Sequence, residues 1–257
     1  MSNLRLDRRG KETGRDVVLL HGCPSSPASM WHVGDALTDI ARVTNVHLPG
    51  YDGSPSLVPY DEELALRSIE QALLDASVSS PIFVGFSFGA FRALELASRA
   101  RSGANGVRGV VSLAGFHDLT HEHRQALAAS AALARDPSKD LAALFTPHFL
   151  SATGMANPAW VAEVGTWFGV VSREDLALEL ETAARTPGVD VGALRVPILA
   201  RVGDADLAAP KVYSELLVNA APNARLEIVA GIGHALIVED EAATARSVRD
   251  FVLAVSP

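Results

Sequence analysis

Residues 82–100 read IFVGFSFGAFRALELASRA, and this stretch carries the clearest structural signal in the chain. Its first five residues are almost all apolar, which is typical of a strand covered on both faces of a parallel sheet. From Phe88 onward the apolar residues follow helical spacing. Between the two stands Gly85-Phe86-Ser87-Phe88-Gly89, a G-x-S-x-G turn of the kind that projects a serine hydroxyl from the carboxyl edge of a sheet. Side chains at Gly85 and Gly89 would clash with the strand and helix that they join.

The same alternation of apolar runs and helical segments extends on both sides of this stretch. We expect further strands at residues 17–20, 43–48, 107–114, 198–202 and 226–229. Helices are expected at residues 28–40, 62–76, 211–220 and 241–255. This strand–helix–strand order predicts an α/β fold with a mostly parallel twisted sheet and helices on both faces.

One long interval, residues 116–194, interrupts the alternation. It contains no convincing strand but several helix patterns, including one that Asp118 or Thr120 can cap and that runs to about residue 135. We therefore expect a helical cap at 116–194, inserted into a core domain formed by residues 1–115 and 195–257. Six apolar side chains of the insert and Trp31 are candidates for the wall of a pocket beneath it. The six are Phe145, Phe149, Met155, Trp160, Trp167 and Phe168. Packing of the insert onto the core would explain the same aromatic residues equally well.

Composition excludes several classes of protein. The 257 residues are 48% hydrophobic and carry a formal net charge of -8, so the chain is expected to fold around a large core. No apolar stretch approaches the ~18 residues of a membrane span. A net negative chain without a basic stripe is a poor partner for nucleic acid. A single cysteine, Cys23, and a polar start without a signal-peptide pattern predict a cytoplasmic protein. The sequence does not distinguish a monomer from a homodimer.

A reactive serine needs a base and an acid, and two segments offer them. A serine hydroxyl becomes a useful nucleophile when a histidine takes its proton and a carboxylate orients that histidine. His234 follows the last expected strand in Gly231-Ile232-Gly233-His234. Asp204 and Asp206 follow the strand at 198–202, so serine, acid and histidine all stand at carboxyl ends of strands. The residues alone leave either aspartate open.

A fourth segment supplies a candidate oxyanion hole. His21-Gly22-Cys23-Pro24 follows the first expected strand, and the backbone N–H of Cys23 can lie beside that of Phe88, whereas Pro24 has none to offer. His117, His121 and His123 could suggest a metal site, but nothing completes a coordination sphere, and a polar first helical turn explains them better. We expect neither a metal nor an organic cofactor.

Taken together, these segments resemble the α/β-hydrolase-fold serine hydrolases with a helical cap, of the esterase and enol-lactonase kind. The resemblance also rests on Trp31, on Leu48-Pro49-Gly50-Tyr51 and on Pro210. It implies that Asp206 is the acid, with Asp204 the alternative, and that Cys23 gives the first oxyanion donor. His47 and Asp52 depart from the pattern, because many relatives carry Asp and Gly there.

The resulting prediction is a serine hydrolase of carboxylic esters or lactones with a small to medium apolar acyl or aromatic group. Ser87, His234 and Asp206 would form the catalytic triad, with Cys23 and Phe88 as backbone oxyanion donors. Cys23 itself is a weak rival nucleophile, because it lacks a paired base. The same motifs also occur in acyltransferases, perhydrolases, carbon–carbon bond hydrolases, lyases and small-molecule receptors without turnover, which remain alternatives.

Overall fold

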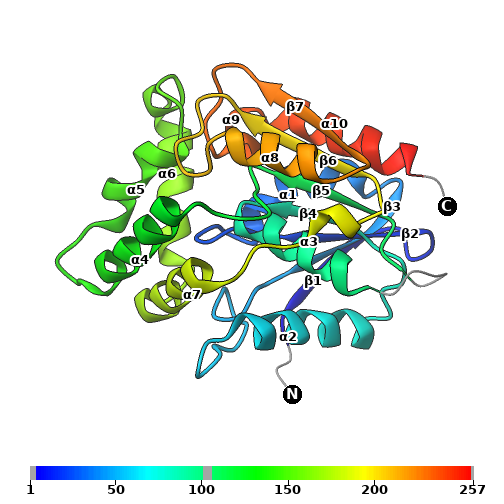
Figure 1. The fold of residues 1–257 in the computed structure, drawn as a ribbon, viewed down its shortest axis with the longest axis horizontal. Helices are drawn as coiled ribbons and strands as arrows, with labels where there is room; N and C mark the ends of the chain where they lie inside the picture. Colours follow the sequence, from blue (N-terminus) through cyan, green and yellow to red (C-terminus); the bar gives the residue numbers. More distant parts are fainter. Residues whose placement is uncertain (1–3, 101–105, 256–257) are drawn as a thin grey trace.

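The computed structural model describes residues 4–100 and 106–255, and its centre is one mixed sheet (Figure 1). Within these residues the sheet has seven strands in the order β1-β3-β2-β4-β5-β6-β7. All neighbouring strands pair in parallel except β1 and β3. The strands are β1 (Leu6–Gly10), β2 (Arg15–Leu20), β3 (Ala41–Val46), β4 (Ile82–Phe86), β5 (Gly109–Leu113), β6 (Ile198–Gly203) and β7 (Ala224–Val229).

The central strands are buried on both faces, which confirms the expected parallel α/β sheet. Alternate residues of β2 belong to different apolar clusters: Val17 and Leu19 face one layer, Val18 and Leu20 the other. Strand β2 pairs with β3 on one side and with β4 on the other. The connection that follows β2 therefore leads to one side of the sheet, and the connection that follows β4 leads to the other. In open α/β sheets, ligands bind beside the carboxyl ends of strands at such a switch point. The loops after β2 and β4 meet there.

Strand β1 was not expected from the sequence. Its residues, Leu6-Asp7-Arg8-Arg9-Gly10, lack an apolar alternation because they pair with β3 at the sheet edge, where most of their side chains reach solvent. The Arg9 guanidinium lies 3.9 Å from the centre of the Trp31 ring. The Arg9 side chain, which comes from β1, therefore covers one face of the Trp31 ring.

Helices cover both faces of the sheet. One layer contains α2 (Glu62–Asp75), α3 (Phe88–Arg99) and α8 (Val212–Ala220). The other contains α1 (Trp31–Gly34), α9 (Leu236–Glu239) and α10 (Glu241–Ala254). The single helix expected at residues 28–40 is wrong, because α1 is one short turn between two 3-10 turns, Ala28–Met30 and Asp35–Leu37. In the described parts of the chain, no helix has both the length and the apolar character needed to cross a bilayer.

The residues between β5 and β6 form helices, as the sequence predicts. They are α4 (His121–Arg135), α5 (Leu141–Phe149), α6 (Pro158–Thr166) and α7 (Arg173–Arg185), and they gather at one end of the sheet (Figure 1, green to yellow-green). The Thr120 side chain accepts a hydrogen bond from the N–H of His123, so Thr120 rather than Asp118 caps α4. Residues 116–194 are called the inserted segment below.

Candidate active site

Ser87 lies on the tight turn between β4 and α3, and its backbone is held in an unusual conformation. Its φ angle is 54° and its ψ angle is -122°, a combination that few non-glycine residues adopt. A side chain at Gly85 would overlap the backbone of Ala90, and one at Gly89 would overlap the carbonyl groups of Leu20 and His21. The Ser87 N–H donates to the Leu113 carbonyl oxygen at 2.8 Å. Strand, helix and neighbouring strand thus hold Ser87 at the sheet edge.

His234 and Asp206 form a buried hydrogen-bonded pair. His234 Nδ1 lies 2.8 Å from Asp206 Oδ2, and both side chains are almost completely shielded from solvent. The other Asp206 oxygen, Oδ1, accepts from the N–H groups of Ala208 and Ala209 at 2.9 and 2.7 Å. Asp206 Oδ2 can accept a hydrogen bond from the Nδ1–H of His234, which leaves Nε2 of the ring as the basic nitrogen.

Asp204, the alternative acid, lies elsewhere. It is exposed and its side chain accepts the Gly231 N–H at 2.6 Å. The structure therefore brings Asp206, and not Asp204, to His234.

Aromatic rings fix the orientation of His234. Its ring centre lies 5.0 Å from that of Phe86 and 5.1 Å from that of Phe149. Ser87 and His234 line the same cavity, which has a volume of about 250 Å³. The serine and histidine thus border one cavity even though 147 positions of chain separate them.

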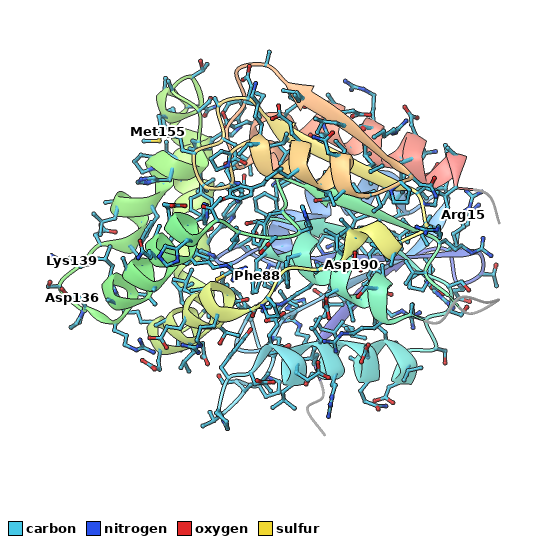
Figure 2. All side chains as sticks on the ribbon, in the orientation of Figure 1. Arg15, Phe88, Asp136, Lys139, Met155 and Asp190 are labelled. Atoms are coloured by element: carbon cyan, nitrogen blue, oxygen red, sulfur yellow. The ribbon has the colours of Figure 1, made fainter. Side chains whose placement is uncertain are left out.

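The two expected oxyanion donors also border this cavity. Phe88 opens α3, so its N–H has no acceptor within the helix (Figure 2 shows Phe88 between the sheet and the inserted segment). Cys23 follows Gly22, and a Cβ atom at Gly22 would lie only 2.9 Å from Ser87 Cβ. The loop after β2 therefore runs directly against the serine.

The expected pocket residues divide into two groups. Phe145, Phe149 and Phe168 line the cavity. The other four candidates do not, and each packs somewhere else. Trp167 is fully buried against Phe86 and Phe149. Trp160 packs against the apolar layer that contains α1, α9 and α10, and Trp31 lies under Arg9. Met155 is partly exposed at the outer end of the inserted segment (Figure 2). Helical spacing marks the buried face of a helix but does not say what that face touches.

Three polar residues of the cavity wall were missed as site residues. They are His123, Ser130 and His148, all from the inserted segment. The signal was present for two of them, since His123, Ala126, Leu127 and Ser130 follow the i, i+3, i+4, i+7 spacing of one face of α4. Neither His117 nor His121 joins His123 in a group of possible metal ligands within the described residues.

Behind the cavity lies a buried charged network that joins α3 to α7. The Arg92 guanidinium is fully buried and binds Glu62 at 2.7 and 2.8 Å and Glu179 at 2.7 Å. It also lies 4.3 Å from the centre of the Phe88 ring. Burial and the neighbouring Glu179 carboxylate raise the pKa of the Cys23 thiol well above its usual value. Cys23 is therefore a neutral thiol, which argues against the rival nucleophile.

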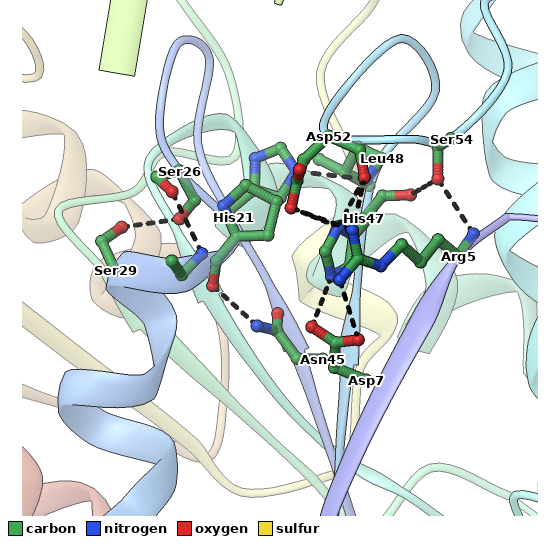
Figure 3. A network of polar contacts seen from close by, with 12 residues as sticks. Arg5, Asp7, His21, Ser26, Ser29, Asn45, His47, Leu48, Asp52 and Ser54 are labelled. Carbon is green, nitrogen blue, oxygen red and sulfur yellow. Dashed lines mark hydrogen bonds and ion pairs between the residues drawn. The ribbon is translucent and has the colours of Figure 1, made fainter. Parts of the chain in front are cut away.

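The two residues that depart from the family pattern contact each other. His47 Nδ1 lies 3.2 Å from Asp52 Oδ2, and His47 Nε2 lies 2.9 Å from Asp7 Oδ2 (Figure 3). Arg5 Nη1 also lies 3.4 Å from Asp52 Oδ2. Asp52 has a φ angle of 38°, which explains why a glycine suits this position. His47 and Asp52 thus help to tie β1 to the turn after β3.

Part of the chain is similar in sequence to a known esterase. The chain is 37% identical over 84 residues to the pimeloyl-[acyl-carrier protein] methyl ester esterase of Vibrio cholerae, a match that covers 33% of this chain and 31% of that protein. The chain thus spans about a third of the length of that relative.

Two solved structures have the same fold over nearly the whole chain. An esterase from Thermogutta terrifontis has a TM-score of 0.88 at 19% identity, covering 99% of this chain and 94% of that one. An enol-lactonase from Burkholderia xenovorans has a TM-score of 0.87 at 21% identity, covering 97% and 96%. The model of the alpha/beta hydrolase family matches residues 17–247. With this match and the strand–turn–helix geometry at Ser87, the chain belongs to the alpha/beta hydrolase family.

Proposed function

We propose that this protein is a serine-dependent hydrolase of carboxylic esters or lactones. The observation that carries the proposal is the buried Asp206–His234 pair, which shares one cavity with a serine on a strained turn. An exposed carboxylate or an unpaired histidine would not prepare a base in this way. The names of the esterase and enol-lactonase relatives support the same bond type.

In the first half of the reaction, the Ser87 hydroxyl oxygen attacks the carbonyl carbon of the ester. His234 Nε2 takes the hydroxyl proton, and the Asp206 carboxylate stabilises the resulting imidazolium. The negative charge moves to the carbonyl oxygen, where the N–H groups of Cys23 and Phe88 stabilise it. His234 then gives its proton to the leaving oxygen, the carbon–oxygen bond breaks, and an acyl group remains on Ser87.

In the second half, water replaces the alcohol. His234 takes a proton from the water molecule, the hydroxide oxygen attacks the acyl carbon, and the same two N–H groups hold the oxyanion. The proton returns to Ser87 and the carboxylic acid leaves. For a lactone, acid and alcohol remain in one product molecule.

The inserted segment acts in this proposal as a cap, residues 116–194, over a core of residues 1–115 and 195–257. It supplies Phe145, Phe149 and Phe168 to the cavity wall, while the core supplies Ser87 and His234. Such a wall favours an apolar acyl or aromatic group of small to medium size, because ligand pockets select mainly by apolar burial and a few polar contacts.

The decisive test is turnover of p-nitrophenyl esters of graded acyl length by the parent and the Ser87→Ala variant. We expect kcat to fall by roughly 10⁴-fold or more in Ser87→Ala, because triad members act as a unit. Ser98→Ala is the matched control, since Ser98 is exposed on the same helix, α3. Activity of Ser87→Ala within tenfold of the parent would refute the proposal.

A further inference from the structure

One face of α4 carries a polar group into an otherwise apolar wall. His123, Ala126, Leu127 and Ser130 line the cavity along about two turns of this helix. The rest of the wall is mostly apolar and includes Leu176, Leu180 and Phe116. Ligand cavities owe their specificity to the few polar atoms placed in such surroundings.

Of the polar groups contributed by the inserted segment, His123 is the one whose ring is free inside the cavity. Ser130 already donates its hydroxyl hydrogen to the Ala126 carbonyl oxygen at 2.9 Å. His148 is exposed, so water satisfies its ring. His123 is half-buried, and within residues 4–100 and 106–255 neither of its ring nitrogens has a hydrogen-bond partner. A half-buried imidazole that lines a cavity without a partner is available to a ligand.

The position of the His123 ring is fixed by its neighbours. The ring packs edge-on against Tyr213, with 5.2 Å between the centres and 88° between the planes. The Tyr213 hydroxyl lies 3.3 Å from Thr120 Oγ1, and Thr120 in turn accepts the His123 backbone N–H. Preorganisation of this kind lowers the entropic cost of a hydrogen bond to a ligand.

The charge state of His123 restricts what it can bind. Burial lowers its pKa, and the nearby charge of His234 lowers it further, with Asp206 opposing. His234 becomes a cation during the proposed reaction, so a second cation beside it would be repelled. A neutral imidazole has one N–H donor and one nitrogen acceptor, which suits a hydroxyl or a carbonyl better than a carboxylate.

We propose that His123 is a specificity-determining residue that hydrogen-bonds a neutral oxygen of the substrate close to the ester group. The substrates are then oxygenated esters or lactones, bearing a hydroxyl or keto group beside the scissile bond, rather than plain alkyl esters. This inference rests on the proposed function for the identity of the bond that is cleaved. It adds a contact from the inserted segment that neither Ser87 nor His234 makes.

The test compares three methyl esters of equal chain length by titration of the acid released: hexanoate, 3-hydroxyhexanoate and 3-oxohexanoate. We expect the parent to favour an oxygenated ester by about tenfold or more in kcat/KM, the range for one buried hydrogen bond.

His123→Phe keeps an aromatic ring against Tyr213 but has no nitrogen, so the preference falls to near one. His123→Asn restores part of it, which loss of packing alone would not allow. His121→Phe, an exposed site two residues away, keeps the parent ratio.

A binding measurement separates this inference from the proposed function. Calorimetric titration of Ser87→Ala with the same esters yields a ratio of Kd values that does not depend on turnover. An unchanged ratio in the His123→Phe background, or no preference in the parent, overturns the role of His123 even if Ser87 is essential. A stronger preference for the carboxylate of monomethyl adipate overturns the neutral substrate class. Turnover that survives Ser87→Ala overturns the proposed function, while the Kd ratio still decides the contact.

Discussion

At the scale of single residues, Asp206 is the most informative position of the site. Replacement by Asn keeps one oxygen for the N–H groups of Ala208 and Ala209, but places an amide N–H against His234 Nδ1. The ring must then adopt the tautomer with the proton on Nε2, so the nitrogen proposed to take the Ser87 proton can no longer act as a base. We expect Asp206→Asn to lower kcat by about 10⁴-fold with little change in unfolding temperature.

The neighbouring aspartate offers a matched control for that change. Asp204 is exposed and accepts the Gly231 N–H, so Asp204→Asn keeps its acceptor oxygen and leaves His234 untouched. Steady-state kinetics of both variants on one ester checks the assignment. Equal losses in the two variants, or a loss in Asp204→Asn alone, would contradict it.

Single residues differ in how far the sequence can predict them. Ser87 was predictable because its turn is local, and the resemblance pointed to Asp206 through its distance from the end of a strand. His123 was missed because its place in the cavity wall depends on which face of α4 turns toward the cavity, and that face is set by packing between distant segments. Trp31 and Trp167 were misplaced for the same reason, since an aromatic side chain packs equally well in a core or a pocket.

At the scale of elements, the buried network around Arg92 joins the helix after Ser87 to the inserted segment. Arg92 lies on α3, Glu179 on α7 and Glu62 at the start of α2. Removal of the cation in Arg92→Met leaves two buried carboxylates without a neutralising charge, although Glu179 still accepts the Tyr51 hydroxyl. We expect this to cost about 3 to 5 kcal/mol in the free energy of unfolding. Urea unfolding measures this loss.

A compensating variant tests the cause of that loss. In Arg92→Met with Glu62→Gln and Glu179→Gln, these three positions no longer carry a charge, and most of the lost stability should return, since a neutral replacement of a buried ion cluster is often tolerated. Burial already raises the pKa of Glu62, although Arg92 opposes the rise. The buried surroundings of Glu62 therefore favour a neutral side chain at this position. If the triple variant is no more stable than Arg92→Met, packing rather than charge accounts for the effect.

Elements were predictable where they are buried and regular. Strand β4 follows the expected range because both of its faces are covered and its residues are apolar. Strand β1 escaped because an edge strand can be polar, and the segment at 28–40 breaks into short turns that still place apolar residues at helical intervals. The helical character of the inserted segment could be read from spacing, but not the way in which it packs on the sheet.

At the scale of the whole molecule, the inserted segment packs onto both helical layers, and His32 ties it to one of them. His32 Nε2 lies 2.6 Å from Glu163 Oε1 on α6, and Nδ1 lies 3.1 Å from Glu241 Oε1 at the start of α10. The hydrogen bond to Glu163 is the main cause that raises the pKa of His32 to about 9, with burial opposing and Glu241 assisting. Both ring nitrogens then carry protons, and one cation links inserted segment and core.

This link makes stability depend on pH in a defined direction. A histidine whose pKa is raised on folding contributes its full stabilisation below its unfolded pKa of ~6.5, and that contribution is lost as the pH rises through the folded value. Between pH 6.5 and 9.5 we therefore expect the stability difference between the parent and His32→Gln to shrink. The change should be no more than about 1 kcal/mol, because the side chains are partly exposed and solvent screens their attraction.

Urea unfolding at several pH values measures this change in stability, with His121→Gln as an exposed control. A difference that stays constant, or grows with pH, would show that His32 is not the cation that joins the two parts.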